Sequence, residues 1–239
     1  FYMILKANTN ITSETDFLEG QVLLFNKPLG WSSFDVVKKA RNIIKSAKNI
    51  RKIKVGHAGT LDPLADGLLI VCSGRFTKRI DEIQGQIKVY TGEITLGATT
   101  PSYDKETEVD KTFDTSDITE EMIHSTSEKF EGKIMQKPPI YSALKREGKR
   151  LYQHAREGTK VKIEAREVEI KSFKITSIEM PKLTFEVICS KGTYIRSLAY
   201  DYGKLLNNGA HLSKLRRDKI GNFSLEDAIS IDSFKQNIL

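Results

Sequence analysis

The residues best placed to do chemistry lie in a glycine-rich loop, KVGHAGTLDPLADG, between Lys54 and Gly67. Glycines permit close backbone approach or a positive φ, and Pro63 restricts Asp62 to extended conformations. A carboxylate is thus held on a stiff turn, where it could act as a nucleophile or a base. Three other interpretations stay open: Asp62 closes a turn or caps a helix, shares a metal with His57, or serves a hydrolase with His57. Neither a third metal ligand at a recognisable spacing nor a water-activating partner accompanies this pair.

Apolar patterns around this loop predict the elements that must position it. Residues 21–26 form a short apolar run that stops at Lys27-Pro28, typical of a strand entering a turn. Helical spacing predicts a helix over 33–48 with Ser32 or Ser33 as N-cap, and 68–72 is a buried strand. We expect further strands at 86–96, 161–176 and 183–190, an extended segment at 211–223, helices at 118–130 and 193–206, and a short terminal helix or tail at 228–239. The acidic stretch 104–117 is expected to be an exposed loop, and 55–67 a structured loop. Because strands and helices alternate irregularly, the fold class is α+β, or mixed α/β.

Charge is unevenly distributed along the chain of 239 residues. Residues 141–239 hold 19 basic and 12 acidic side chains, which accounts for the whole net charge of +7. No acid occurs between Val36 and Leu61, although eight Lys or Arg residues lie there. Such segregation suits a polyanion such as nucleic acid, although a solvated basic helix would show the same pattern.

Composition narrows the class of protein. Hydrophobic residues make up 39% of the chain, enough for a packed core, and no apolar run is long enough to span a membrane. The first residues lack the features of a signal peptide. Cys72 and Cys189 lie in apolar strand-like runs, so we expect reduced, buried thiols in a cytoplasmic protein.

Six blocks of sequence carry a resemblance. GHAGTLDPLADGLL is similar to the catalytic motif of bacterial tRNA pseudouridine synthases of the TruB family. Five further blocks resemble family motifs in the family's order: LLFNKPLGWSSFDVV, KVYTGEITLGATT, PPIYSALKREGKRLYQHAREG, CSKGTYIRSLAYDYG and GAHLSKLRRDKIGNFS. Together they span Leu23 to Ser224, so the chain is identified as a member of this family.

The resemblance implies an activity and a fold. The family converts uridine to pseudouridine at position 55 in the T-loop of tRNA, after flipping the base out of its stack. It implies no metal and no cofactor, tRNA (its T-stem-loop) as partner, no membrane and a monomer. The implied pseudouridine-synthase fold has a central, largely antiparallel mixed sheet flanked by helices and loops, with an RNA-clamping insertion. An alternative from another class is a non-catalytic RNA-binding or tRNA-folding module on the same scaffold.

The resemblance also assigns roles to single residues. Asp62 matches the essential aspartate, and Arg196 is expected to pair with it, since an adjacent guanidinium favours an ionised carboxylate. Tyr90, Tyr194 and Leu215 are expected to contact the flipped base, and His57 to fill the space that the base leaves. From spacing alone, Tyr90 and Leu215 would be core residues and Arg196 a surface residue at a helix N-terminus.

Basic and aromatic residues outside this group are expected to bind RNA. The polar segment 137–158 has too few apolar positions to bury itself and is expected to clamp RNA. The helix at 33–48 and the Arg pair after Leu215 would extend the basic surface. The predicted RNA-binding residues are Lys38, Lys45, Tyr141, Lys145, Arg146, Lys149, Arg150, Arg156, Arg216 and Arg217.

The same comparison predicts the domain organisation. We expect an N-terminal tail at 1–20 and a catalytic domain at 21–239 that includes a thumb-like insertion at about 132–158. Many family members carry a C-terminal PUA domain. Because only 15 residues follow Ser224, we expect a short form that lacks it.

Overall fold

The computed structural model describes residues 4–6, 9–12, 14–159 and 161–238. The chain divides into two compact units: unit 1 comprises Phe1–Tyr90 and Leu215–Leu239, and unit 2 comprises Thr91–Lys214. Strands β5 (Lys88–Leu96) and β13 (Ala210–Ile220) each begin in one unit and end in the other. Sequence reasoning expects one domain from residue 21 onward. Both crossings of the chain between the units lie inside these strands.

Unit 1 is built on a mixed sheet with the strand order β1-β2-β4-β13. Strand β2 pairs antiparallel with β4, while β1–β2 and β4–β13 are parallel pairs. Strand β3 adds to β4 and β14 adds to β13, both antiparallel. The elements of unit 1 besides β13 are β1 (Ile4–Leu5), β2 (Val22–Lys27), α1 (Ser33–Ala47), β3 (Val55–His57), β4 (Ala65–Ser73), the 3-10 turn η1 (Gly74–Arg79), α2 (Ile80–Gln84), β14 (Phe223–Ser224), η2 (Leu225–Asp227) and α6 (Ile231–Ile238).

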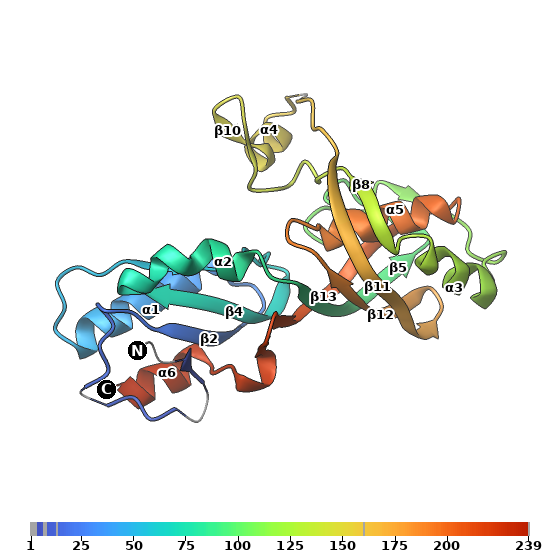
Figure 1. Cartoon of the computed structure of the whole chain (residues 1–239). Helices are drawn as coiled ribbons and strands as arrows, with labels where there is room; N and C mark the ends of the chain where they lie inside the picture. Colours follow the sequence, from blue (N-terminus) through green and yellow to red (C-terminus); the bar gives the residue numbers. More distant parts are fainter. Residues whose placement is uncertain (1–3, 7–8, 13, 160, 239) are drawn as a thin grey trace. The chain divides into compact units, whose positions relative to one another are not determined.

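Both faces of this sheet are buried, which explains the continuous apolar runs of β2 and β4. On one face, Leu23 and Phe25 of β2 pack with α1 and with Phe234 of α6. On the other face, Leu24 and Ile70 pack with α2 and η1. Helix α2 and helix α6 accordingly lie on opposite sides of β2 and β4 (Figure 1). The segment expected as a tail contributes Leu5, Ile11 and Phe17 to the first of these clusters, so these three residues belong to the core.

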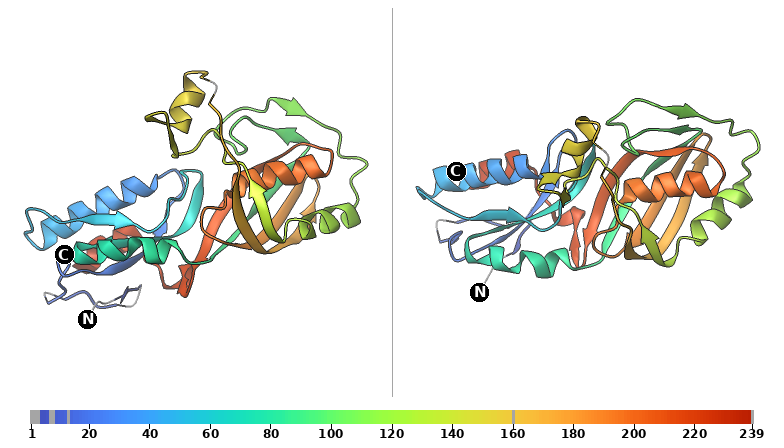
Figure 2. Two further views of the ribbon diagram at one scale, coloured as in Figure 1. Left: turned by 45° about the horizontal axis from the view of Figure 1, so that its top comes forward. Right: turned by 90° about the horizontal axis from the view of Figure 1, so that it is seen from above.

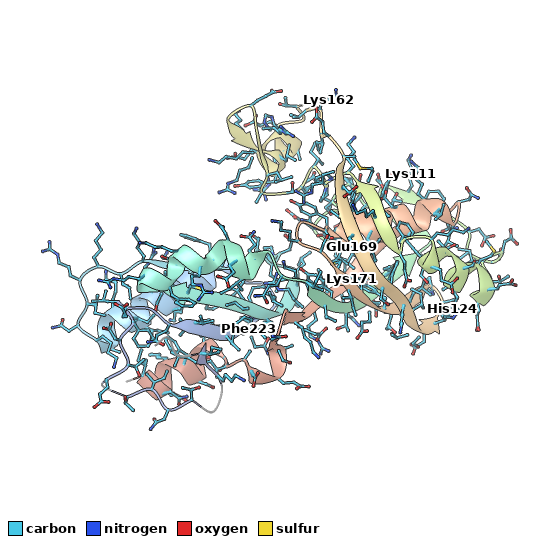
Figure 3. The ribbon with its side chains drawn as sticks, viewed as in Figure 1. Lys111, His124, Lys162, Glu169, Lys171 and Phe223 are labelled. Carbon is cyan, nitrogen blue, oxygen red and sulfur yellow. The ribbon has the colours of Figure 1, made fainter. Side chains whose placement is uncertain are left out.

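Unit 2 contains the sheet order β13-β5-β12-β11-β8. Strand β11 (Arg166–Glu179) pairs antiparallel with β12 (Lys182–Cys189) and with β8 (Gly132–Gln136). Its alternating sequence buries one face only: Glu169 and Lys171 stay on the solvent side (Figure 3). The remaining elements are β6 (Ala98–Thr99), β7 (Lys111–Thr112), α3 (Glu120–Glu128), β9 (Lys145–Arg146), β10 (Lys149–Arg150), α4 (Leu151–Arg156) and α5 (Ile195–Leu205).

An aromatic cluster fastens α3 and α5 to the same face of this sheet (Figure 2). The ring of Phe173 on β11 meets those of Phe130, Phe185 and Tyr202 at centroid distances of 5.6–6.1 Å. The Tyr202 hydroxyl donates to the carbonyl of Ile123 at 2.8 Å, which satisfies its buried polar end. The C-terminal half of α5, which carries Tyr202, is thereby fixed relative to the strands.

Most predicted elements are confirmed. The strands at β2, β4, β5, β11, β12 and β13 and the helices α1, α3, α5 and α6 lie where periodicity predicts them. The mixed, largely antiparallel α+β class is confirmed as well. Both cysteines are reduced and buried, as expected. The prediction of a structured loop at 55–67 is only partly right, because Val55–His57 forms β3 and β4 already begins at Ala65.

No helix among the described residues is both long enough and apolar enough to cross a membrane. Within the expected insertion at about 132–158, residues 132–136 form β8 and pair with β11.

Replacing Ser32 tests the start of α1, on which the loop geometry described below depends. The Ser32 side chain accepts from the Asp35 amide, and the Asp35 carboxylate accepts from the Ser32 amide, forming a capping box. We expect Ser32→Ala to lower the free energy of unfolding by about 1 kcal/mol, measured by urea denaturation. Ser46→Ala, at an exposed position of the same helix, is the control and should cause no loss; equal effects of the two changes would contradict the cap.

Candidate active site

Asp62 lies in the loop between β3 and β4, and every backbone carbonyl from residue 59 to residue 63 accepts a hydrogen bond. Ser33 Oγ, at the first residue of α1, donates to the Leu61 carbonyl at 2.9 Å and accepts from the Leu61 amide at 2.8 Å. The Asp62 carbonyl accepts from the Ala65 amide at 3.1 Å, and that of Pro63 from the Gly30 amide at 2.8 Å. The stiff presentation predicted from the glycines and Pro63 therefore also relies on distant donors.

Arg217 supplies the donors for the first two carbonyls. Its side chain is 1% exposed and donates to the carbonyls of Gly59 (3.1 Å), Thr60 (3.2 Å) and Leu68 (2.8 Å). The expectation that Arg217 extends an RNA-binding surface is therefore corrected: the guanidinium faces the interior of unit 1, where phosphates cannot reach it. Its neighbour Arg216 points the other way, is more than half exposed and pairs with Asp218 at 2.7 Å, because successive residues of a strand face opposite sides.

A second buried cation, Lys27, lies at the end of β2. Its side chain is fully buried, and Nζ donates to the carbonyls of Pro28 (2.9 Å) and Trp31 (2.6 Å). Burial lowers the pKa of Lys27 to about 8, against the opposing negative charges of Asp66 and Asp62. The carboxylate of Asp62 thus lies in the field of a buried ammonium.

His57 stays neutral near pH 7. Burial, and next the positive charge of Arg217, hold the pKa of this imidazole below its usual value, with a smaller opposing contribution from the Gly59 backbone. His57 ends β3, half-buried and paired in register with Val71. A neutral, flat side chain beside the loop fits the expected role of occupying the space that a flipped base leaves.

Unit 1 also holds Tyr90 and Leu215. Both side chains are buried, at 8% and 9% exposure. Leu215 pairs in register with Ala65, three residues after Asp62, since β13 runs parallel to β4. Asp62, His57, Tyr90 and Leu215 therefore belong to one compact unit, while Tyr194 and Arg196 belong to the other.

Arg196 is buried in the first turn of α5, not on a surface. Its Nη1 donates to the Tyr141 carbonyl at 2.8 Å, and its Nε lies 3.6 Å from Asp104 Oδ2. Asp104 is itself 5% exposed, and its carbonyl accepts from the hydroxyls of Thr100 and Ser102. The prediction of an exposed loop at 104–117 is therefore wrong for Asp104, which a buried ion pair draws inward, and right for most of the acidic residues that follow it.

Gln136 holds the backbone of Tyr194 by two hydrogen bonds. Its amide nitrogen donates to the Tyr194 carbonyl at 3.0 Å, and its oxygen accepts from the Tyr194 amide at 2.7 Å. The Ser197 hydroxyl donates to the Lys137 carbonyl at 2.8 Å. The guanidinium of Arg166 lies 4.9 Å from the centre of the Tyr194 ring, in a cation–π contact. The segment 194–197 is thus tied to residues 136–141, where the insertion begins.

The insertion presents most of the predicted RNA-binding residues. Strands β9 and β10 pair antiparallel and expose Lys145, Arg146, Lys149 and Arg150. Arg156 is exposed at the end of α4, near Glu106 at 3.6 Å, whereas Tyr141 is half-buried. On unit 1, Lys38 and Lys45 are exposed on α1.

Sequence reasoning missed Lys27, Asp104, Gln136 and Arg166. Lys27 lies within the block LLFNKPLGWSSFDVV, directly before Pro28, and Gln136 lies two residues before the block PPIYSALKREGKRLYQHAREG. Their positions in or beside these blocks could have pointed to them. Asp104 and Arg166 lie among other charged residues, so no signal in the sequence distinguishes them. Within the described residues, no three His, Cys, Asp or Glu side chains gather into a group that could hold a metal ion.

Comparison with known proteins decides the family. Residues 45–195, more than half of the chain, match the TruB family pseudouridylate synthase N-terminal domain. The chain belongs to the TruB family. A TruB-family relative, the tRNA pseudouridine synthase B of Flavobacterium johnsoniae, is 55% identical over 224 residues, which cover 93% of this chain and 98% of that protein. The protein of the same name from Phocaeicola vulgatus is 48% identical over 221 residues, 92% of this chain and 94% of that one.

Solved structures share the fold of this TruB-family chain. A chain in a crystal structure of a Cbf5–Nop10–Gar1 complex matches with a TM-score of 0.69 and 28% identity, over 97% of this chain and 58% of that one. A chain in an H/ACA ribonucleoprotein bound to a substrate RNA containing 2′-deoxyuridine matches with a TM-score of 0.66 and 26% identity, over 92% of this chain and 53% of that one. This chain therefore spans little more than half of each. With the family match, these likenesses confirm the predicted pseudouridine-synthase fold.

The buried ammonium of Lys27 should make stability depend on pH. The pKa of Lys27 is about 8 in the folded state and near 10.5 when unfolded, so the unfolded chain binds more protons between these values and stability rises with pH there. We expect the difference in unfolding free energy between wild type and Lys27→Met to shift by about 2 kcal/mol in favour of wild type from pH 7.5 to pH 10. Urea denaturation at both pH values measures it; a constant difference would refute the lowered pKa.

Proposed function

We propose that this chain isomerises uridine to pseudouridine at position 55 in the T-loop of tRNA, with Asp62 as the catalytic residue. The observation that carries the proposal is the loop 59–63, whose fully occupied carbonyls hold one carboxylate stiffly in unit 1. The TruB-family match and relatives named tRNA pseudouridine synthase B supply the substrate class.

The reaction needs one ionised acid. The C1′–N1 bond breaks, the uracil turns, and a C1′–C5 bond forms; N1 gains a proton and C5 loses one, so the overall change is an isomerisation without oxidation or reduction. Asp62 acts on the ribose, as nucleophile or as base, while uracil leaves.

The target base must first leave its stack, which costs a few kcal/mol. Contacts made only with the flipped nucleotide offset this cost: in unit 1, Tyr90 and Leu215 contact the base, and neutral His57 fills the space behind it. Tyr194 belongs to the other unit, and the base contact expected of it stays a prediction. Asp62 and Arg196 belong to different units, and their expected pairing stays a prediction.

The partner is the T-stem-loop of tRNA, bound by a monomer in the cytoplasm without a cofactor. The exposed cations of the insertion and of α1 support an RNA partner, because basic side chains outnumber acidic ones in both segments, although Lys149 and Arg156 lie beside Glu157 and Glu106. A second candidate, an RNA-binding module without catalysis, is favoured by the same cations. The two candidates differ in the role of Asp62, which is catalytic only in the first.

Replacing the Asp62 carboxylate tests catalysis directly. We expect Asp62→Asn to lower pseudouridine formation at least about a thousand-fold, equivalent to about 4 kcal/mol, because the amide is neither nucleophile nor base. Binding of a T-stem-loop should stay within about threefold. Carbodiimide-dependent primer-extension stops measure the product and its position, and fluorescence anisotropy measures binding.

Asp66→Asn is the matched control, since it makes the same change four residues along the chain. It should retain turnover within a few-fold. Normal turnover by Asp62→Asn would refute the assignment of Asp62, and a wild-type protein that binds the RNA but forms no pseudouridine would favour the non-catalytic module.

The basic hairpin of the insertion should act through phosphates. We expect log K for the T-stem-loop to fall linearly with log salt. In the double variant Lys145→Gln/Arg146→Gln the slope should become shallower by about 1 for each phosphate that is no longer neutralised, while turnover at saturating RNA should not change. Lys235→Gln, an exposed change on α6, should leave the slope as in wild type; identical slopes in all three proteins would argue against the hairpin as an RNA-binding element.

A further inference from the structure

Arg217 is a buried cation that no carboxylate neutralises within the part of the chain that the structure describes. Its hydrogen-bond partners are three backbone carbonyls, those of Gly59, Thr60 and Leu68. Taking a guanidinium out of water is costly, and an apolar side chain of similar size would pack at lower cost. What an apolar side chain could not do is donate to these carbonyls, which would otherwise be buried without partners.

The geometry links two elements to the loop. Gly59 and Thr60 lie three and two residues before Asp62, while Leu68 belongs to β4, which follows the loop. One planar guanidinium therefore ties the entrance of the loop to the strand after its exit. Strands β13 and β4 approach closely at this point: Gly67 has a φ of +102°, and a Cβ there would overlap the backbone of Arg217. The side chain is thus held at a fixed distance from the loop.

The Arg217 guanidinium lies close enough to the start of the loop for its charge to act on His57. After burial itself, its charge is the next cause that lowers the pKa of His57, which stands just before the loop on β3. The planar fork matches carbonyls that lie in different directions, whereas a lysine ammonium would reach them from a single point.

We propose that Arg217 is a positioning residue for the reaction: through the carbonyls of Gly59 and Thr60 it sets the backbone that presents Asp62. This inference rests on the proposed function, in which Asp62 acts on the ribose. Arg217 itself touches neither RNA nor the reacting atoms. Its replacement should therefore slow chemistry while leaving RNA binding almost unchanged, since small misplacements of a catalytic group cost rate.

The test compares Arg217→Lys with Arg75→Lys, the same change at an exposed arginine of unit 1 that pairs with Glu19 at 2.9 Å. For Arg217→Lys we expect a single-turnover rate of pseudouridine formation, at saturating T-stem-loop, at least about tenfold below wild type, with the Kd within about threefold. For Arg75→Lys we expect a rate within about twofold of wild type, because its exposed side chain pairs with Glu19 and not with the loop carbonyls. Arg217→Gln, which keeps donors but removes the charge, should fall below wild type by a similar factor to Arg217→Lys.

Hydrogen exchange supplies a readout independent of activity. The Leu61 amide, which donates to Ser33 Oγ, should exchange at least about tenfold faster in Arg217→Lys than in wild type, while amides in the middle of β11 keep their rates. Slower chemistry with faster Leu61 exchange supports the proposal. A normal rate, an unchanged Leu61 exchange, or a slower rate matched by equally weaker binding would overturn it.

Failure of this proposal is distinguishable from failure of the proposed function. Wild type and Asp62→Asn run in the same assay decide whether the chain makes pseudouridine and needs Asp62, whatever Arg217→Lys does. If wild type proves inactive, the exchange measurement still decides whether Arg217 holds the loop. Because Arg217→Lys keeps the buried charge and an aliphatic stem, urea denaturation can establish that it is folded before either readout.

Discussion

The hydrogen bonds to the carbonyls of residues 59–63 are the constraint on which the rest of the site depends. Most of their donors come from three separate places: the start of α1, the turn after β2, and β13. No local turn could supply all of them. The loop is therefore shaped by the whole of unit 1, and the two-faced core that fixes α1 and β13 is also what fixes Asp62.

Unit 1 buries two cations that lower its stability and support the site. Lys27 and Arg217 are both buried, and the charge of Arg217 adds to the burial that lowers the pKa of Lys27. Two buried cations near each other destabilise a fold compared with apolar side chains. Both cations donate to carbonyls of turns that border Asp62, so the site gains a rigid backbone and a positive field together. Active sites commonly hold such perturbed groups.

Periodicity was enough to predict most of the fold, because α1, β11 and α5 each bury one side of a regular element. The candidate site was predictable where it sits in a local motif: Asp62 and its stiff turn could be derived from Gly59 and Pro63. Arg217 was misjudged because it follows another arginine, and nothing along the chain distinguishes the buried residue from the exposed one until β13 is placed beside β4. Gln136 and Asp104 were missed because side chains that bind distant backbone or distant charges leave no periodic signal.

The two native thiols have a practical consequence. Cys72 and Cys189 are both fully enclosed, and burial raises the pKa of Cys72 to about 12, so its thiolate is scarce at neutral pH and alkylating reagents find little to react with. A cysteine introduced at the tip of the β9–β10 hairpin would thus be a selective handle for a fluorophore on an otherwise unlabelled protein. A dye there would let the arrival of an RNA at the insertion be followed in real time without first removing any natural residue.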